Sequence, residues 1–188
     1  MMNRRDALKA LSLATGGALT GAALSWTGCK TEPTVFRFFK PEDTETLDAI
    51  GETILPTTED SPGAGEIGIS EFIDIYAADC LKSSHQDALR AGFAERLQPN
   101  LEGQTDFTDL TPQQQYDLLL ALDEEAILYN ENLQPLQPPH YFSILKNIIL
   151  FGYFSSEAGA KQALRYLPIP GRYEGDFPFQ SGDKAWAI

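Results

Sequence analysis

The sequence predicts an all-α fold, an irregular bundle of about five to six helices with an extended aromatic tail at its C-terminal end. Val35 is the only valine in 188 residues, whereas leucine and alanine are abundant, and this composition disfavours β-sheets. Apolar residues also recur at helical spacing in several segments. With 43% hydrophobic and 11% aromatic residues, the chain has enough apolar material for one packed core.

The first expected helix begins near Pro41, because proline is tolerated in the first turn of a helix. Leu47, Ile50 and Ile54 follow at helical spacing, and Pro56 ends the pattern.

Two further helices are expected before residue 99. Ser70 can cap the second helix. The apolar face of this helix comprises Phe72, Ile73, Tyr76 and Cys80, so we expect Cys80 to be a buried, inert thiol. Pro99 ends the third helix, which is marked by Ala88, Leu89, Phe93 and Leu97.

The clearest helix start is Thr111-Pro112-Gln113-Gln114, with an N-cap threonine, a proline at the first helical position and a capping-box glutamine. This helix continues through Ile127. A stiff, proline-containing connection leads to a helix around residues 142–151 that is apolar on most of its circumference, and we expect this helix at the centre of the bundle. A short final helix is expected over residues 156–166.

Beyond Leu167 the sequence is punctuated by proline and glycine and rich in aromatic residues. Such a tail either drapes over its own bundle or docks on another chain. The partner-interface candidates are Tyr173, Phe177, Phe179 and Trp186. The expected organisation is therefore a signal segment (1–28), a linker (29–40), a helical domain (41–167) and the tail (168–188).

The charge of the chain argues against anionic partners. There are 27 acidic and 14 basic residues, for a net charge of −13. Without residues 1–28, 26 acidic and 11 basic residues remain, a net charge of −15. Such a surface repels phosphate groups, so we expect no nucleic acid as partner and no polybasic membrane docking.

The first thirty residues have the features of an export signal. Arg4 and Arg5 precede an uncharged and only mildly apolar stretch from Ala10 to Cys29, as in twin-arginine (Tat) signals, although Ala7 stands where an aromatic residue is usual. Ordinary secretion is the alternative. Small residues before Cys29 resemble a lipoprotein cleavage box, which predicts lipidation of Cys29. The alternative is an uncleaved anchor, because the uncharged stretch approaches the roughly 20 residues of a membrane span.

No residue pattern indicates a catalytic, cofactor or metal site in the chain. The Gly63–Gly68 segment has G-x-G-x-x-G spacing, but it lacks the preceding strand that a dinucleotide site requires and is interpreted as a helix-to-helix loop. The two histidines are far apart: His85 is expected in a solvated turn and His140 in a structural or surface position. The remaining candidates are carboxylates that fit solvated helix faces, namely Glu52, Glu71, Asp74, Asp79, Asp123, Glu124 and Glu125.

Two separated blocks of sequence resemble the gluconate 2-dehydrogenase subunit 3 family. The first is TILPTTEDSPGA at residues 53–64, followed by GISEFID at 68–74. The second is GYFSSEAG at residues 152–159, followed by LRY at 164–166 and PGRY at 170–173. The resemblance extends from about Leu47 to the C-terminus and includes the twin-arginine leader.

The resemblance implies a small, cofactor-free accessory subunit of a membrane-associated sugar or sugar-acid dehydrogenase. In such complexes a large flavoprotein of the glucose–methanol–choline type binds FAD and oxidises the substrate, often passing electrons to a cytochrome c subunit that carries haem. The small subunit carries the signal and accompanies the folded flavoprotein through the Tat machinery to the bacterial periplasm. The expected location is therefore periplasmic and membrane-anchored.

Two other hypotheses remain at this point. One is an autonomous periplasmic lipoprotein that binds or processes carbohydrate, since aromatic residues can stack on sugars and carboxylates can hydrolyse glycosides. The other is an assembly factor that leaves the complex after export. Pairing of Cys80 with a partner chain is a further alternative to the inert thiol.

Overall fold

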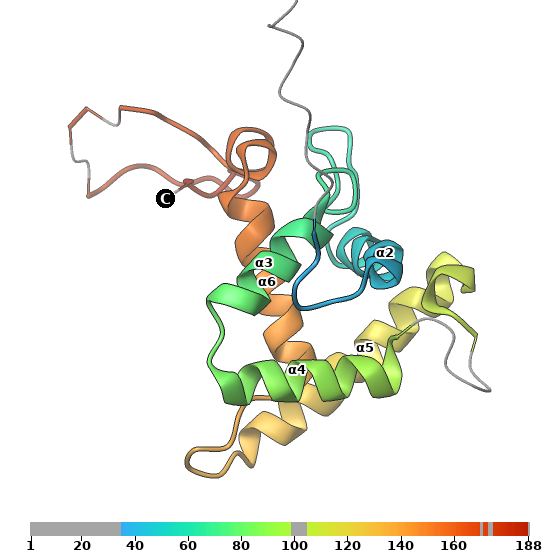
Figure 1. Cartoon of the computed structure of the whole chain (residues 1–188). Coiled ribbons are helices and arrows are strands. Elements are labelled where there is room, and N and C mark those ends of the chain that lie inside the picture. Colours follow the sequence, from blue (N-terminus) through green and yellow to red (C-terminus); the bar gives the residue numbers. More distant parts are fainter. Residues whose placement is uncertain (1–34, 99–104, 170, 173–174, 188) are drawn as a thin grey trace, which may run out of the picture. The chain divides into compact units, whose positions relative to one another are not determined.

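A computed structural model describes residues 35–98, 105–169, 171–172 and 175–187 (Figure 1). In these residues the regular elements are helical, and the all-α prediction is confirmed. The five longer helices are α2 (Thr44–Ile54), α3 (Ile69–Asp79), α4 (Ser83–Arg96), α5 (Pro112–Glu131) and α6 (Tyr141–Ser155). The short turns are η1 (Pro41–Asp43), η2 (Phe107–Asp109) and η3 (Gly159–Ala163). Arg4, Arg5, Cys29 and Tyr173 lie outside the described residues.

Helix α6 forms the centre of the bundle, as its apolar sequence predicts. It packs against α3, α4, α5 and η3, and Figure 1 shows it running between the other helices. Eight of its residues are buried, including Phe142, Leu145 and Ile149. Phe151 differs from the expectation, because its side chain is 56% exposed. Burial of apolar surface around α6 is therefore the main source of stability.

The contact between α4 and α6 depends on a residue without a side chain. A Cβ atom added to Gly92 in α4 would lie 2.1 Å from Cγ of Tyr141 in α6. Glycine weakens a helix interior, so its presence here serves close approach of the two helices rather than helix propensity.

A buried carboxylate holds the segment that leads into the bundle. Asp74 in α3 is fully buried and accepts backbone N–H groups of Arg37 (2.9 Å), Phe38 (2.8 Å) and Phe39 (2.8 Å). The expectation of a solvated Asp74 is therefore wrong. The side chain instead satisfies three donors that would otherwise be unpaired in or near the core.

The start of α3 also differs from the prediction. Gly68, in the left-handed region with φ of 69°, is the N-cap, and Ser70 lies inside the helix. The backbone N–H of Ser70 donates to Oδ1 of Asp48 in α2 at 2.9 Å. A neighbouring helix thus supplies the acceptor that a local cap would provide.

The predicted start of α5 is confirmed in detail. The Thr111 hydroxyl accepts from the Gln114 N–H, and Gln114 Oε1 accepts from the Thr111 N–H at 2.9 Å. This reciprocal pair satisfies two helix-end donors.

The expectation for Cys80 is wrong. Cys80 is exposed rather than buried, because it is the residue after the last turn of α3. The short final helix expected over about residues 156–166 is present but shorter, with η3 at its centre. Ser156 has an extended backbone and its hydroxyl accepts from the Gly159 N–H at 3.0 Å, so the chain turns instead of continuing α6.

Replacing Asp74 with alanine should destabilise the protein severely, because three N–H groups lose their acceptor. We expect a loss of about 3 kcal/mol or more in the free energy of unfolding measured by urea denaturation. Asp79→Ala is the matched control on the same helix, since its 2.7 Å ion pair with Arg37 is half exposed and contributes less than about 1 kcal/mol. Equal losses in the two variants would contradict the assigned role of Asp74.

Candidate functional site

The glycine-rich loop between α2 and α3 is occupied by a carboxylate of the protein itself. Glu52 Oε1 accepts from the N–H and hydroxyl of Thr57, both at 2.8 Å, and Oε2 accepts from the Gly65 N–H at 3.2 Å. A Cβ atom added to Gly63 would lie 1.9 Å from this carboxylate. Glu52 therefore holds the loop in place through these hydrogen bonds. Its carboxylate occupies N–H groups that a phosphate would need as donors, and its negative charge would repel a phosphate. The interpretation as a helix-to-helix loop is confirmed.

His140 is a structural residue, one of the two roles expected for it. It is the N-cap of α6, and its Nδ1 accepts the Phe142 N–H at 3.3 Å. Its Nε2 lies 3.6 Å from Glu125 Oε1. Because Nδ1 must be unprotonated to accept, the cap requires a neutral ring with its hydrogen on Nε2, facing Glu125.

The surroundings of His140 favour this neutral form. Burial lowers the pKa of His140, the Glu125 carboxylate opposes the shift, and the Arg96 guanidinium adds to it. The neighbouring Tyr141 is also buried, and burial raises its pKa to about 12, so its hydroxyl stays protonated. This cluster is thus built for structure at neutral pH rather than for proton transfer.

The other titratable residues do not converge on a centre. His85 lies in the first turn of α4, not in a turn between helices, so that expectation is wrong. Asp123 pairs with Lys146 at 2.7 Å and Glu125 with Arg96 at 3.4 Å. Among the residues that the structure describes, no group of three or more His, Cys, Asp and Glu side chains could hold a metal ion.

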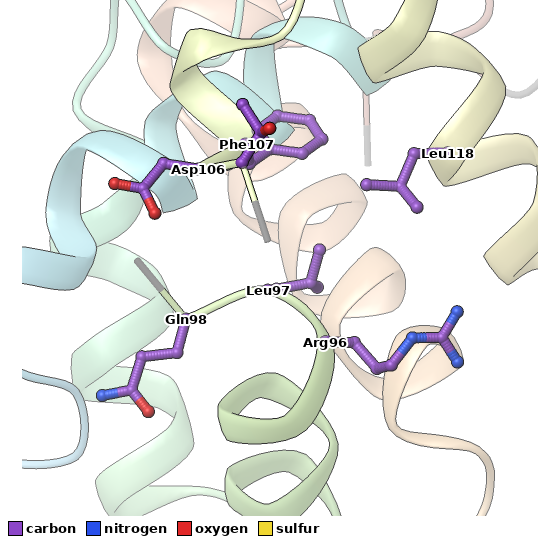
Figure 2. A pocket seen from close by; sticks show the side chains of 7 residues that line it. Arg96, Leu97, Gln98, Asp106, Phe107 and Leu118 are labelled. Atoms are coloured by element: carbon purple, nitrogen blue, oxygen red, sulfur yellow. The ribbon is translucent and has the colours of Figure 1, made fainter. Parts of the chain in front are cut away.

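One hollow of about 240 Å³ lies between the end of α4 and η2 (Figure 2). Arg96 and Asp106 stand on opposite sides of it, with the apolar Leu97, Phe107 and Leu118 between them. The Arg96 guanidinium already contacts Glu125. The lining also includes the polar Gln98 and Thr105. The described residues thus give this hollow a mixed polar and apolar lining with one cation that is already paired.

The tail contains two kinds of aromatic residue. Phe177 and Trp186 pack edge to face, with ring centroids 5.6 Å apart, and the Arg165 guanidinium lies over both rings, 4.9 and 4.3 Å from their centroids. Backbone bonds between Arg165 and the segment around Ala185 close the loop. Phe179, in contrast, is 79% exposed. Of the four predicted interface residues, two are thus engaged with Arg165, Phe179 projects into solvent, and Tyr173 lies outside the described residues.

Two further apolar surfaces were not predicted from the sequence. On α3 and α6, Phe72, Tyr76 and the exposed Phe151 form a ring cluster with centroids 5.6 to 6.0 Å apart. On α5, the exposed apolar residues are Tyr116, Leu120, Ile127 and Leu128. No clear sequence signal marks the second surface, because the apolar residues of α5 are interspersed with five acidic residues and their spacing does not distinguish buried from exposed positions.

None of the helices in the described part of the chain has the length and apolar character needed to cross a bilayer. The predictions about export and lipidation rest on residues 1–29, which are outside it.

Comparison with known proteins gives one match. A family model described as gluconate 2-dehydrogenase subunit 3 matches residues 41–171, which is more than half of the chain. No curated protein and no solved structure matches.

The neutral cap makes a prediction for stability against pH. His140 has a lowered pKa in the folded state, so its contribution is complete above the unfolded value of about 6.5 and is lost as pH falls through the folded pKa. Urea denaturation between pH 8 and pH 5 should show this loss in the wild type. His140→Asn keeps an N-cap acceptor that does not titrate, so the variant should lack this component. Identical pH profiles for the two proteins would contradict the neutral-cap assignment.

Proposed function

The chain belongs to the gluconate 2-dehydrogenase subunit 3 family, and from this premise we propose that it is the non-catalytic small subunit of a membrane-associated, FAD-dependent sugar or sugar-acid dehydrogenase. Family membership implies a small subunit of such a dehydrogenase complex, with the other subunits as its partners. The proposed partner is the large flavoprotein, which binds FAD and oxidises the substrate. A cytochrome c subunit with haem is the proposed electron acceptor.

The family match over residues 41–171 is the observation that carries this proposal. The surface of the described part supports it. Exposed apolar side chains gather on α5, on α3 with α6, and in the tail, whereas single scattered apolar residues would need no explanation. Three of the carboxylates considered as chemical candidates have structural partners: Asp74 and Glu52 accept backbone N–H groups, and Asp123 pairs with Lys146.

The proposed role also accounts for the leader. The Tat machinery moves folded proteins, and FAD insertion requires folding in the cytoplasm. A flavoprotein without its own signal can therefore leave the cytoplasm only when it is already bound to a subunit that has one. We assign this signal to Arg4 and Arg5 and the membrane anchor to Cys29, or to an uncleaved leader. The complex then resides in the periplasm, at the membrane.

Substitution of the twin arginines should prevent export of the flavoprotein, which then stays in the cytoplasm. For Arg4→Lys with Arg5→Lys, we expect at least a tenfold drop in flavin and dehydrogenase activity in the periplasmic and membrane fractions, with FAD-loaded flavoprotein accumulating inside the cell. Cys29→Ser is the companion variant: it should leave export intact, and release of the complex from the membrane would assign the anchor to Cys29, whereas retention would assign it to the uncleaved leader. Normal export of the flavoprotein in a strain lacking this gene would rule out the escort role, and turnover by the purified chain alone would favour the autonomous lipoprotein.

The exposed part of the tail should contribute to flavoprotein binding. Phe179→Ser should weaken the complex at least tenfold, or about 1.4 kcal/mol, measured by the flavoprotein retained on the tagged full-length chain. Val35→Ser is a matched control, because Val35 is 78% exposed and Phe179 79% exposed, and both lie in non-helical segments. Equal retention by the two variants would show that the tail packs only on its own chain.

A further inference from the structure

A groove between α2 and α5 has the features of a binding site for a helix. We define the α2–α5 groove by Tyr116 and Leu120 of α5 and the α2 side chains beside them, Thr53 and Ile54. Ile127 extends the exposed apolar stripe of α5 beyond the groove. We propose that this groove binds an amphipathic helix of the flavoprotein subunit that carries apolar residues on one face and Lys or Arg along one edge of that face. This inference rests on the proposed function and specifies where and how the partner is held.

The stripe is separate from the face that α5 buries. Leu119, Leu122 and Ala126 are buried against the bundle. Tyr116, Leu120 and Ile127 are 53%, 45% and 53% exposed. Their spacing of four and seven residues places them in one line along the helix, roughly 16 Å long at 1.5 Å per residue. α5 therefore has a second apolar face, which the described residues of this chain leave uncovered.

The groove contains hollows that can accept apolar side chains of a bound helix. Tyr116 borders two hollows along the α2–α5 contact, one of about 440 Å³ beside Ala49 and Pro56 and one of about 200 Å³ beside Ile54 and Leu120. Helices that bind in grooves anchor through apolar side chains at successive turns, and alternating hollows along one helix offer places for such anchors.

Charge selects the occupant. α5 contains Asp117, Asp123, Glu124, Glu125 and Glu131 and no lysine or arginine. Asp123 and Glu125 are paired with Lys146 and Arg96 of neighbouring helices. Asp117 lies three residues before Leu120 and Glu124 lies four residues after it, so both carboxylates lie along the same edge of the stripe. A helix with basic residues along one edge of its apolar face is attracted to this arrangement.

The same charge argument disfavours a second copy of the chain as the molecule bound in the groove. The part of the chain that follows residue 28 has a net charge of −15, and an α5-to-α5 pairing would bring two acidic helices together. Like charges across an interface oppose association and favour a partner of opposite sign.

The test compares two arginine substitutions, one on α5 and one directly after it. Full-length tagged chain and the flavoprotein subunit are co-expressed, and the FAD-containing flavoprotein retained per tagged chain is measured by absorbance. Leu120→Arg puts a cation in the groove and should lower retention at least tenfold. Leu133→Arg adds the same charge just after the end of α5, at a residue that is 37% exposed and lines neither hollow of the groove, and should change retention less than twofold. Circular dichroism and thermal unfolding check that both variants are folded.

Two further experiments test where the flavoprotein contacts α5 and whether the acidic residues attract it. A photo-crosslinking phenylalanine analogue at Tyr116 should capture the flavoprotein, and the same analogue at Leu133, which lines neither hollow of the groove, should not. Asp117→Lys with Glu124→Lys should weaken binding at least tenfold. Added salt should weaken binding of the wild type by screening the charges, and this salt dependence should be absent in the double variant.

The outcomes separate the two proposals. If the wild-type chain retains no flavoprotein, the proposed function fails and the groove assignment fails with it. If the wild type retains flavoprotein and Leu120→Arg does so equally well, or if Leu133→Arg loses as much, only the groove assignment is overturned. Conversion of a wild-type dimer to a monomer by Leu120→Arg, with flavoprotein retention unchanged, would assign the groove to a second copy and also overturn the proposal.

Discussion

The bundle depends on carboxylates that accept backbone N–H groups within the fold. Asp74 takes three such bonds from residues 37–39, which places Phe39 against Phe93 of α4, with ring centroids 5.0 Å apart. Asp48 and Glu52 on α2 do the same for the start of α3 and the loop before it. In each case an anion satisfies donors at a chain segment that has no regular partner, so part of the acidic composition is internal structure rather than surface charge.

Local signals made most helices predictable. The Thr111 capping box, Pro41 near the first turn of a helix and the apolar circumference of α6 depend on residues within one or two helical turns of each other, and all three appear as expected. The interactions of Asp74 could not be predicted in the same way, because its acceptor role joins residues 35 to 37 positions apart. A lone aspartate on a helix is compatible with both solvation and burial until the chain around it is placed.

The surface features of the candidate site were also hard to predict, because they depend on contacts between residues that are distant in the sequence. The aromatic tail was predicted as an interface because aromatic residues near a chain end rarely remain in water, yet Phe177 and Trp186 pack around Arg165, a contact across the loop that no spacing rule reveals. The exposed stripe of α5 was missed for a related reason. Apolar residues alternate with carboxylates and glutamines along this helix, and only the packing of α2 and α6 against it shows which apolar residues are buried and which are left exposed.

The proposed escort through a membrane places a physical demand on the proposed interface. A complex that must stay together during transport needs slow dissociation, and stable interfaces bury about 800 Å² on each partner with a few well-packed anchors. One exposed phenylalanine in the tail is too small for this. A helix seated along the 16 Å stripe of α5 supplies the anchors and, through Asp117 and Glu124, a charge match that speeds encounter. The tail then acts as a second contact on the same partner, and two linked contacts dissociate far more slowly than either alone.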